Sequence, residues 1–174
     1  MNGLEAIIFD FGDTLADEGS EEKDRDGVTL RADLFPGTLE ALHDLYRRGY
    51  RLGLLADCVP GTGRASYDNV LGQHGLRPLF PSIVTSDDAG ADKPDRRMFS
   101  AILGEMRAES SPVIMVGNRL DRDIAGGNRA GMITVWARMS TRYRQEPEGP
   151  DEVADFEFSD YQDLVGLIRQ IEEK

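Results

Sequence analysis

Short apolar runs alternate with helix-like segments along almost the whole chain, and this alternation restricts the fold more than any other feature. The first run, residues 5–10, is bounded by turn residues and has the length of a strand that is buried on both faces. Further strands are predicted at 50–57, 82–86, 112–117, 132–137 and, as a short edge strand, 154–158. Runs of this kind are typical of parallel sheets.

The segments between these runs have helical periodicity. In 36–49 the apolar residues Leu39, Leu42 and Leu45 recur at helical spacing, with a proline near the start and a glycine just beyond the end. Further helices are predicted at 62–73, from Pro94 onward, at 120–130 and at 160–172. Strands separated by single helices imply βαβ units with right-handed crossovers. We therefore predict a three-layer, Rossmann-like α/β fold, with a parallel sheet of five to six strands and helices on both faces.

Length and composition favour one ordinary globular domain. The chain has 174 residues, of which 40% are hydrophobic, and we expect a single domain over residues 1–174. The apolar runs are too short to span a bilayer, and no signal peptide is evident, so we expect a cytoplasmic protein without a membrane partner. Cys58 is the only cysteine, which excludes an internal disulfide bond and fits a reducing compartment.

Charge argues against nucleic acid as a partner. The net charge is −12, whereas contacts to phosphate backbones need clustered lysine and arginine. The basic stretch 138–145 contains Tyr143 between arginines, but it belongs to 138–153, which we predict to be a long polar loop. The segment 15–35 is acidic, and we predict a solvated loop there as well. The sequence does not determine the oligomeric state.

Polar residues follow several of the predicted strands. They lie at 10–14, 56–58, 85–88 and 117–123, and Lys93 stands just before the helix that follows the third strand. In an open parallel sheet the carboxyl ends of the strands line the ligand-binding crevice. We therefore expect carboxylates, an amide and a lysine to meet there. Asp10 could still be no more than the polar end of a core strand.

Four stretches, in order and spacing, resemble the haloacid dehalogenase-like hydrolase superfamily over nearly the whole chain. They are "FDFGDTL" after the first strand, "LFPGTLEALHDLYRRGYRLGLLAD" through the second, "VTSDDAGADKPDRRMF" around the lysine, and "IMVGNRLDRDIAGGNRAGM" after the fourth. A response-regulator receiver also pairs aspartates with a Lys-Pro, but its acceptor aspartate follows the third strand. Here the best candidate follows the first strand.

The resemblance implies a phosphohydrolase in which Asp10 attacks phosphorus, forms an aspartyl phosphate and is released by water. Lys93 would screen the nucleophile and the phosphoryl oxygens. Magnesium would be held by Asp10, the carbonyl of Gly12, Asn118 and Asp123. The positions expected to bind the substrate are Gly12, Ala56 and Asp57.

Three positions depart from the family pattern. Gly12 stands where phosphatases of the family carry a second aspartate that serves as acid and base, and Asp13, one residue on, is expected to point elsewhere. Ala56 replaces a phosphate-binding hydroxyl, and Asn118 replaces a carboxylate. Loss of a positioned acid or base lowers rates by about 10²–10⁴. If only the acid is missing, Gly12→Asp is expected to raise the turnover of substrates with poor leaving groups. No gain would indicate a deeper loss, through Ala56, Asn118 or the shape of the site.

The segment lengths leave no room for a substantial cap domain, so we expect an open crevice that suits a phosphorylated substrate, including a large or extended one. Two hypotheses follow. The first is a magnesium-dependent phosphohydrolase, weak or specialised, that acts through Asp10. The second is a catalytically impaired relative that binds a phosphorylated ligand or a protein partner. The sequence alone leaves both open.

Overall fold

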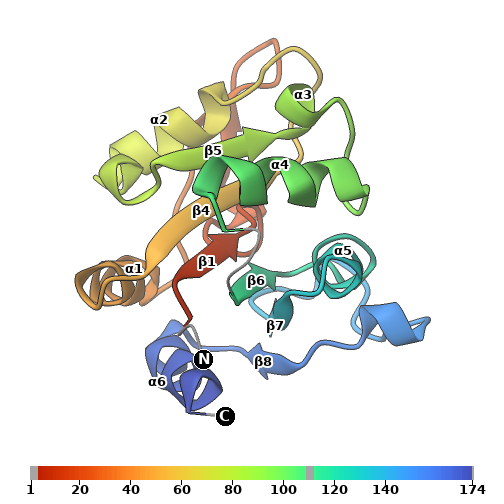
Figure 1. Cartoon of the computed structure of the whole chain (residues 1–174). Helices are drawn as coiled ribbons and strands as arrows, with labels where there is room; N and C mark the ends of the chain where they lie inside the picture. The colour runs from red at the N-terminus through yellow and green to blue at the C-terminus, as the bar shows by residue number, and fades with distance from the viewer. Residues whose placement is uncertain (1–3, 109–111, 174) are drawn as a thin grey trace.

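The computed structural model describes residues 4–108 and 112–173. Its main feature is a six-stranded parallel sheet with the order β5-β4-β1-β6-β7-β8 (Figure 1). The strands are β1 (Ala6–Phe9), β4 (Arg51–Ala56), β5 (Ser82–Thr85), β6 (Val113–Gly117), β7 (Ile133–Ala137) and β8 (Phe156–Phe158). The prediction of a parallel sheet of five to six strands is therefore confirmed, including the edge strand.

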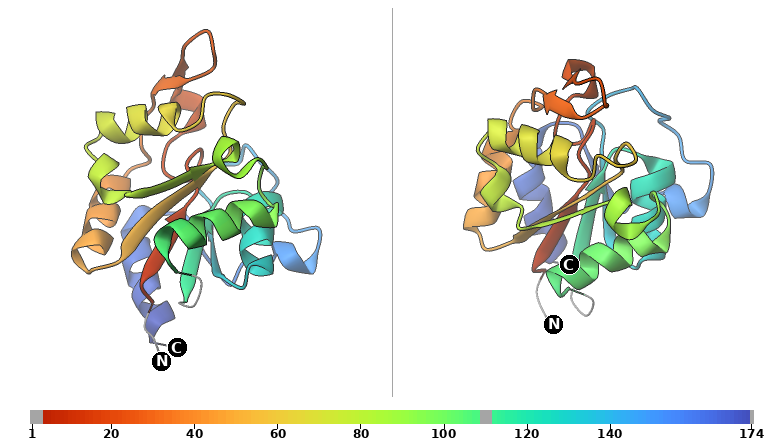
Figure 2. Two further views of the ribbon diagram at one scale, coloured as in Figure 1. Left: turned by 45° about the horizontal axis from the view of Figure 1, so that its top comes forward. Right: turned by 90° about the horizontal axis from the view of Figure 1, so that it is seen from above.

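Helices cover both faces of this sheet and complete the three layers (Figures 1 and 2). On one face lie α1 (Thr38–Arg47), α2 (Ala65–Gln73) and α6 (Tyr161–Glu172), and on the other lie α4 (Arg96–Met106) and α5 (Ala125–Arg129). A short helix, α3 (Ser86–Ala89), follows β5 directly. The part of the chain that the structure describes contains no helix long and apolar enough to cross a membrane.

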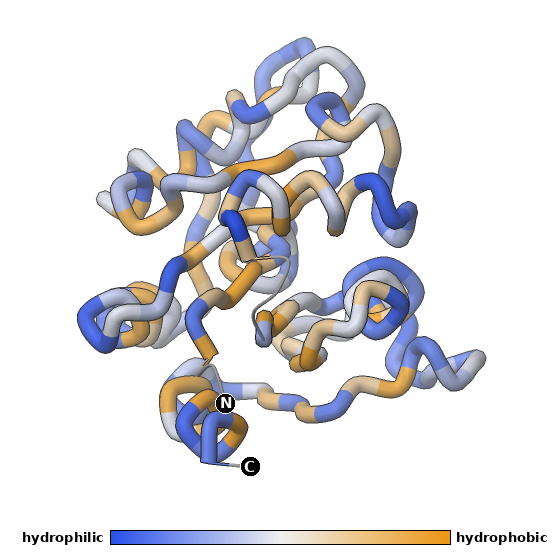
Figure 3. The backbone as a smooth tube through the Cα atoms, in the orientation of Figure 1, coloured by the Kyte–Doolittle hydropathy of each residue, from blue (hydrophilic) through white to orange (hydrophobic). Residues whose placement is uncertain are grey.

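The alternation of side chains along β1 explains why its sequence is apolar throughout. Ile7 and Phe9 pack into the core on the side of α1, α2 and α6, whereas Ala6 and Ile8 pack against α4 on the opposite face. None of the four is exposed to solvent. Figure 3 shows hydrophobic colour along the central strands and hydrophilic colour in the outer loops. The sheet is thus buried on both faces, and its strand ends are rigidly placed.

Two helix predictions are corrected in detail. The helix expected from Pro94 begins two residues later, at Arg96, because the side chain of Asp95 caps it by accepting a hydrogen bond from the amide of Arg97 at 2.9 Å. The segment predicted as one helix over 120–130 is a π-helical turn, η3 (Leu120–Ile124), followed by α5. Amides in this turn donate to the carbonyl of Arg119.

The predicted acidic loop at 15–35 has regular structure. It contains a 3₁₀ turn, η1 (Glu18–Ser20), and a small antiparallel hairpin of β2 (Glu22–Lys23) and β3 (Thr29–Arg31). The hairpin turn ends at Gly27, whose φ of 84° is unfavourable for other residues. We call residues 17–34 the flap. The sequence pattern missed it because both strands are too short to show alternation.

Side chains of α2 hold the flap against the domain. The hydroxyl of Ser66 accepts a hydrogen bond from the amide of Thr29 at 2.9 Å, and Asn69 donates to the carbonyl of the same residue at 3.1 Å. A ring nitrogen of His74 lies 2.8 Å from the carbonyl of Ala32. The flap projects beyond the carboxyl ends of the strands (Figure 2). Within the described ranges, no further insertion is large enough to form a cap domain, as predicted.

Candidate active site

Three charged side chains meet at the carboxyl ends of the strands. The Nζ atom of Lys93 lies 2.6 Å from Oδ1 of Asp10 and 2.7 Å from Oδ1 of Asp123, and it donates to the carbonyl of Leu55 at 2.9 Å. Asp10 follows β1, Asp123 lies in η3 beyond β6, and Lys93 precedes α4. The sequence therefore identified all three members of this strand-end cluster (Asp10, Lys93 and Asp123).

Because the cluster is buried, the pKa values of Lys93 and Asp123 depend strongly on the charged groups beside them. Asp123 has no exposed surface, and Lys93 is 4% exposed. Burial alone lowers the pKa of an ammonium group, but the carboxylates of Asp10 and Asp123 outweigh it and raise the pKa of Lys93 above the usual lysine value. Burial, together with the charge of Asp10, raises the pKa of Asp123, and Lys93 opposes this change. Lys93 is therefore a permanent cation between two carboxylates.

The sheet also fixes the second oxygen of Asp10. The amide of Asp10 donates to the carbonyl of Val116 at 2.9 Å, which continues the ladder between β1 and β6 by one residue. A tight turn then returns the hydroxyl of Thr14 to Oδ2 of Asp10, at 3.0 Å. The same hydroxyl lies 3.5 Å from Oδ1 of Asn118. Asp10 and Asn118 thus face each other across Thr14.

These oxygens suit a partly hydrated magnesium ion. Asp10 and Asn118 supply a carboxylate and an amide oxygen, and Gly12 lines the same cavity. Both carboxylate oxygens of Asp123 already accept hydrogen bonds, from Lys93 and from the amide of Arg119 at 2.9 Å. Among the described residues, no three Asp, Glu, His or Cys side chains form a metal cluster. Magnesium commonly binds through one or two carboxylates and retains waters, so the donor chemistry fits.

The two predicted substrate-binding positions after β4 differ in character. Asp57 accepts a hydrogen bond from the amide of Lys93 at 2.8 Å and forms an ion pair with Nη1 of Arg122 at 2.7 Å. Both carboxylate oxygens of Asp57 thus accept hydrogen bonds from protein groups, and the side chain holds Lys93 and Arg122 in position. Ala56 is buried at the end of β4 and offers no side-chain donor.

Asp13 does not take the place of the absent aspartate at position 12. Its side chain has no exposed surface and accepts hydrogen bonds from Ser140 at 2.7 Å and Arg142 at 2.8 Å. Its backbone is in the left-handed region, with φ at 51°, which turns the side chain toward the 138–145 loop. As expected, Asp13 points away from the strand-end cluster, and its contacts hold that loop beside the site.

Two acidic side chains of the flap, Glu18 and Glu21, line the cavity and were not predicted from the sequence, and Glu18 is the one beside Gly12. A Cβ atom built on Gly12 would stand 2.5 Å from Oε1 of Glu18, so this carboxylate occupies the space beside the glycine. Its Oε2 atom accepts a hydrogen bond from the hydroxyl of Tyr143 at 2.8 Å. We define Glu18 and Tyr143 as the flap pair. The aspartate of Gly12→Asp would therefore displace Glu18 from its present position.

The surroundings of Glu18 favour its protonated form more than water does. Burial raises the pKa of Glu18 above the ordinary glutamate value, by more than the hydrogen bond from Tyr143 lowers it. The carboxylates of Asp13 and Asp10 raise it further. In the sequence Glu18 is one of many acidic residues of the flap, and nothing distinguishes it from the others. The only related signal is the glycine at position 12, which leaves space that another side chain can occupy.

The cavity over the strand-end cluster has a volume of about 240 Å³. Its walls come from the strand ends, the flap, α2 and the 138–145 loop, and include Asp10, Glu18, Lys93, Asn118, Arg119 and Tyr143. The guanidinium of Arg119 stacks on the ring of Tyr143, 4.3 Å from its centre. The crevice is therefore partly covered, which differs from the open site expected from the sequence.

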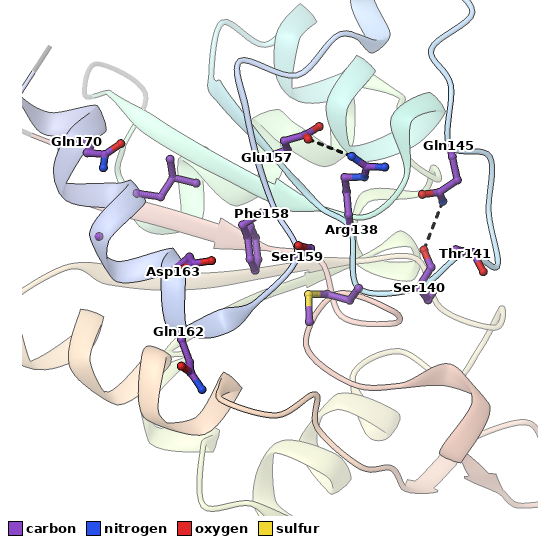
Figure 4. A pocket seen from close by; sticks show the side chains of 13 residues that line it. Arg138, Ser140, Thr141, Gln145, Glu157, Phe158, Ser159, Gln162, Asp163 and Gln170 are labelled. Atoms are coloured by element: carbon purple, nitrogen blue, oxygen red, sulfur yellow. Dashed lines mark hydrogen bonds and ion pairs between the residues drawn. The ribbon is translucent and has the colours of Figure 1, made fainter.

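A second pocket, of about 850 Å³, lies between β8, α6 and the 138–145 loop (Figure 4). In it Arg138 pairs with Glu157 at 3.0 Å, and Gln145 donates to the carbonyl of Ser140 at 3.3 Å. None of the site residues predicted from the sequence lines this pocket. The residues that could perform chemistry thus gather in the smaller cavity.

Comparison with known proteins gives relatives that are phosphatases. The chain is 29% identical over 137 residues to glyceraldehyde 3-phosphate phosphatase of Methanopyrus kandleri, a match that covers 79% of this chain and 57% of the relative. It is 30% identical over 134 residues to phosphoserine phosphatase of Thermus thermophilus, a match that covers 77% and 51%. The chain thus spans about half the length of the curated relatives it matches.

Solved structures and a family model agree with this result. The fold matches the crystal structure of a HAD phosphatase from Thermococcus onnurineus with a TM-score of 0.74 at 18% identity, covering 94% of this chain and 97% of the other. A model of haloacid dehalogenase-like hydrolases matches residues 18–131. The match begins after Asp10, so the structure, and not the match, places that residue beside Lys93. The chain belongs to the haloacid dehalogenase-like hydrolase family.

Proposed function

We propose that this protein is a magnesium-dependent phosphohydrolase that acts on small phosphate monoesters through Asp10. The observation that carries the proposal is the Lys93 ammonium, which contacts both Asp10 and Asp123 at the end of the central strand. This arrangement places a positive charge beside Asp10, where phosphoryl oxygens would approach.

The three residues of the strand-end cluster then have different roles in the reaction. Asp10 attacks phosphorus, and the bond between phosphorus and the alcohol oxygen breaks. Lys93 offsets the negative charge that gathers on the phosphoryl group, and Asp123 holds Lys93 in position from the buried side. A water molecule then attacks the phosphorus of the aspartyl phosphate, which releases phosphate and restores Asp10.

Asp10, the carbonyl of Gly12 and Asn118 would hold the magnesium ion, while Asp123 adds negative charge behind Lys93. When bound, the metal would reduce the repulsion between the carboxylate and the phosphate. Asn118 supplies a neutral oxygen in place of a carboxylate, which weakens the attraction for a divalent cation. We therefore expect modest metal affinity.

The cavity supports small substrates over extended ones. Its volume of about 240 Å³ fits a phosphate group with a short carbon chain, and residues of the flap form part of its wall. Arg119 and Arg122 also line the cavity, where each forms an ion pair at 2.7 Å, with Asp121 and Asp57 respectively. The relatives named for glyceraldehyde 3-phosphate and phosphoserine hydrolysis act on molecules of this size.

The test is phosphate release from a panel of short-chain phosphate esters, with and without magnesium, by the native chain and by Asp10→Asn. We expect magnesium-dependent release by the native chain and none above background by the variant. Magnesium should also raise the unfolding temperature of the native chain, by the equivalent of about 1.4 kcal/mol at tenfold excess over its dissociation constant. Binding of phosphorylated ligands without turnover would instead favour the hypothesis of an impaired relative.

A further inference from the structure

The proposed reaction needs a proton donor. When the bond between phosphorus and an alkyl oxygen breaks, the leaving oxygen needs a proton, and the water that later attacks must lose one. Gly12 has no side chain to offer, and Asp13 is bound to Ser140 and Arg142 outside the cavity. The donor must therefore come from another part of the cavity wall.

Most carboxylates of the cavity already form ion pairs with a nearby lysine or arginine. Asp57, Asp123 and Glu21 each have an oxygen within 2.7 Å of a lysine or arginine nitrogen. A carboxylate engaged in such an ion pair is less suited than an unpaired one to donating a proton to a leaving oxygen. Asp10 is reserved for the attack on phosphorus.

Glu18 differs from these carboxylates in its partners and in its direction. Its nearest cation, Nε of Arg142, is 3.8 Å away, and the hydroxyl of Tyr143 holds Oε2. The other oxygen, Oε1, lies beside Gly12, and within the described residues it receives no hydrogen bond. One oxygen of Glu18 is thus anchored, and the other is available in the cavity.

We propose that Glu18 is the general acid and base of this site, delivered by the flap into the space that Gly12 leaves empty. This inference rests on the proposed function. The geometry that supports it is the 2.5 Å between Oε1 and the place of a Cβ atom on Gly12, together with the anchor at Tyr143. Gly12 and Glu18 would then depend on each other, because a side chain at position 12 would occupy the space in which Glu18 now lies.

The proton balance closes over the two steps. In the first, Asp10 forms a bond to phosphorus, the bond to the leaving oxygen breaks, and the proton of the Glu18 carboxyl passes to that oxygen. In the second, a water oxygen forms a bond to phosphorus, its proton passes to the Glu18 carboxylate, and the bond between Asp10 and phosphorus breaks. Glu18 is protonated again for the next cycle.

The test compares first-turnover kinetics on glycerol phosphate, which has a poor leaving group, with those on 4-nitrophenyl phosphate, which has a good one. Glu18→Gln keeps an acceptor for the hydroxyl of Tyr143, so the fold around it is preserved. We expect the first turnover of glycerol phosphate to slow by about 10²–10⁴-fold. The initial burst of 4-nitrophenolate should persist, followed by slow breakdown of the aspartyl phosphate.

Two further variants sharpen this test. Glu22→Gln removes an exposed carboxylate of the same flap and should change neither ester's kinetics. Gly12→Asp combined with Glu18→Ala moves the carboxylate from the flap to the turn after β1. This double variant should turn over glycerol phosphate faster than Glu18→Ala does.

The outcomes separate the two proposals. If Asp10→Asn is inactive while Glu18→Gln slows both esters equally, or slows neither, the role of Glu18 is refuted and the proposed function stands. If the native chain hydrolyses neither ester, or Asp10→Asn remains active, the proposed function fails and the role of Glu18 fails with it.

Discussion

The strand-end cluster and the flap pair occupy the same cavity but are held in different ways. Asp10, Lys93 and Asp123 stand at the ends of sheet and helix elements and are almost fully buried, and both carboxylates lie within 2.7 Å of the lysine nitrogen. Glu18 and Tyr143 lie on irregular segments, are only partly buried and share one hydrogen bond of 2.8 Å. The comparison teaches that charge neutralisation is built into the core, while the proposed proton transfer depends on segments added above it.

The largest expected effect comes from the strand-end cluster, with Lys93→Met. The change leaves two buried carboxylates without their cation, and loss of one partner of a buried ion pair costs about 3–5 kcal/mol. Thermal unfolding should show a corresponding loss of stability. Lys23→Met, which breaks the half-exposed pair with Glu21, is the matched control and should cost less than about 1 kcal/mol. Equal losses in the two variants would contradict the difference between buried and surface charges.

The Lys93→Met variant should also respond to pH in a defined direction. Burial and Asp10 raise the pKa of Asp123, and Lys93 opposes them, so removal of the lysine raises that pKa further above its unfolded value. A carboxyl group whose folded pKa is raised destabilises the fold once it ionises. The stability that Lys93→Met loses relative to the native chain should therefore become smaller as pH falls below the raised pKa of Asp123. It should become larger as pH rises through that pKa. Unfolding temperatures measured between pH 5 and pH 8 would show a constant deficit if this explanation were wrong.

A smaller effect is expected where the flap attaches to α2. Ser66→Ala leaves the amide of Thr29 without its acceptor, and an unsatisfied buried donor costs about 1–3 kcal/mol. Hydrogen exchange should accelerate in the flap and leave β1 and β4 protected. Thr62→Ala removes an exposed hydroxyl that bonds a backbone carbonyl and serves as the control. Uniform acceleration across the sheet would show that the flap and the core open together.

The smallest effect is expected at Tyr143→Phe, which removes one hydrogen bond from Glu18. A neutral hydrogen bond contributes about 0.5–1.5 kcal/mol, so the first turnover of an alkyl phosphate should slow by up to about tenfold. Tyr46→Phe removes a hydroxyl from an exposed residue of α1 and should have no effect. Loss of activity as complete as in Asp10→Asn would mean that Tyr143 does more than orient Glu18.

The same contrast explains what the sequence could predict. The strands and their parallel arrangement follow from apolar runs, and the rule for strand ends places the polar residues that follow them at one crevice. The choice of Lys93 and Asp123 as the partners of Asp10 came from the resemblance to the family. These signals are local, or depend on a sheet whose topology is strongly restricted. Such signals predict where the residues lie, whereas the catalytic and metal-binding roles of the residues remain proposals.

The flap and its contributions were not predictable in this way. β2 and β3 are short, and the groups that satisfy the backbone of the flap are side chains of α2, such as Ser66, far along the chain. Glu18 lies in an acidic run in which every carboxylate looks solvated. Its partner Tyr143 lies in a loop that has no pattern of its own. Only three-dimensional contacts distinguish Glu18 from its acidic neighbours.

The central claim is that Asp10 carries the phosphoryl group during turnover. The most direct measurement is mass spectrometry of peptides from the native chain, quenched in acid during turnover of 4-nitrophenyl phosphate with magnesium. We expect a phosphoryl group on Asp10, present in larger amount in Glu18→Gln and absent from Asp10→Asn. Turnover with no phosphoryl group on the peptide that contains Asp10, and at an equal rate in Asp10→Asn, would contradict it.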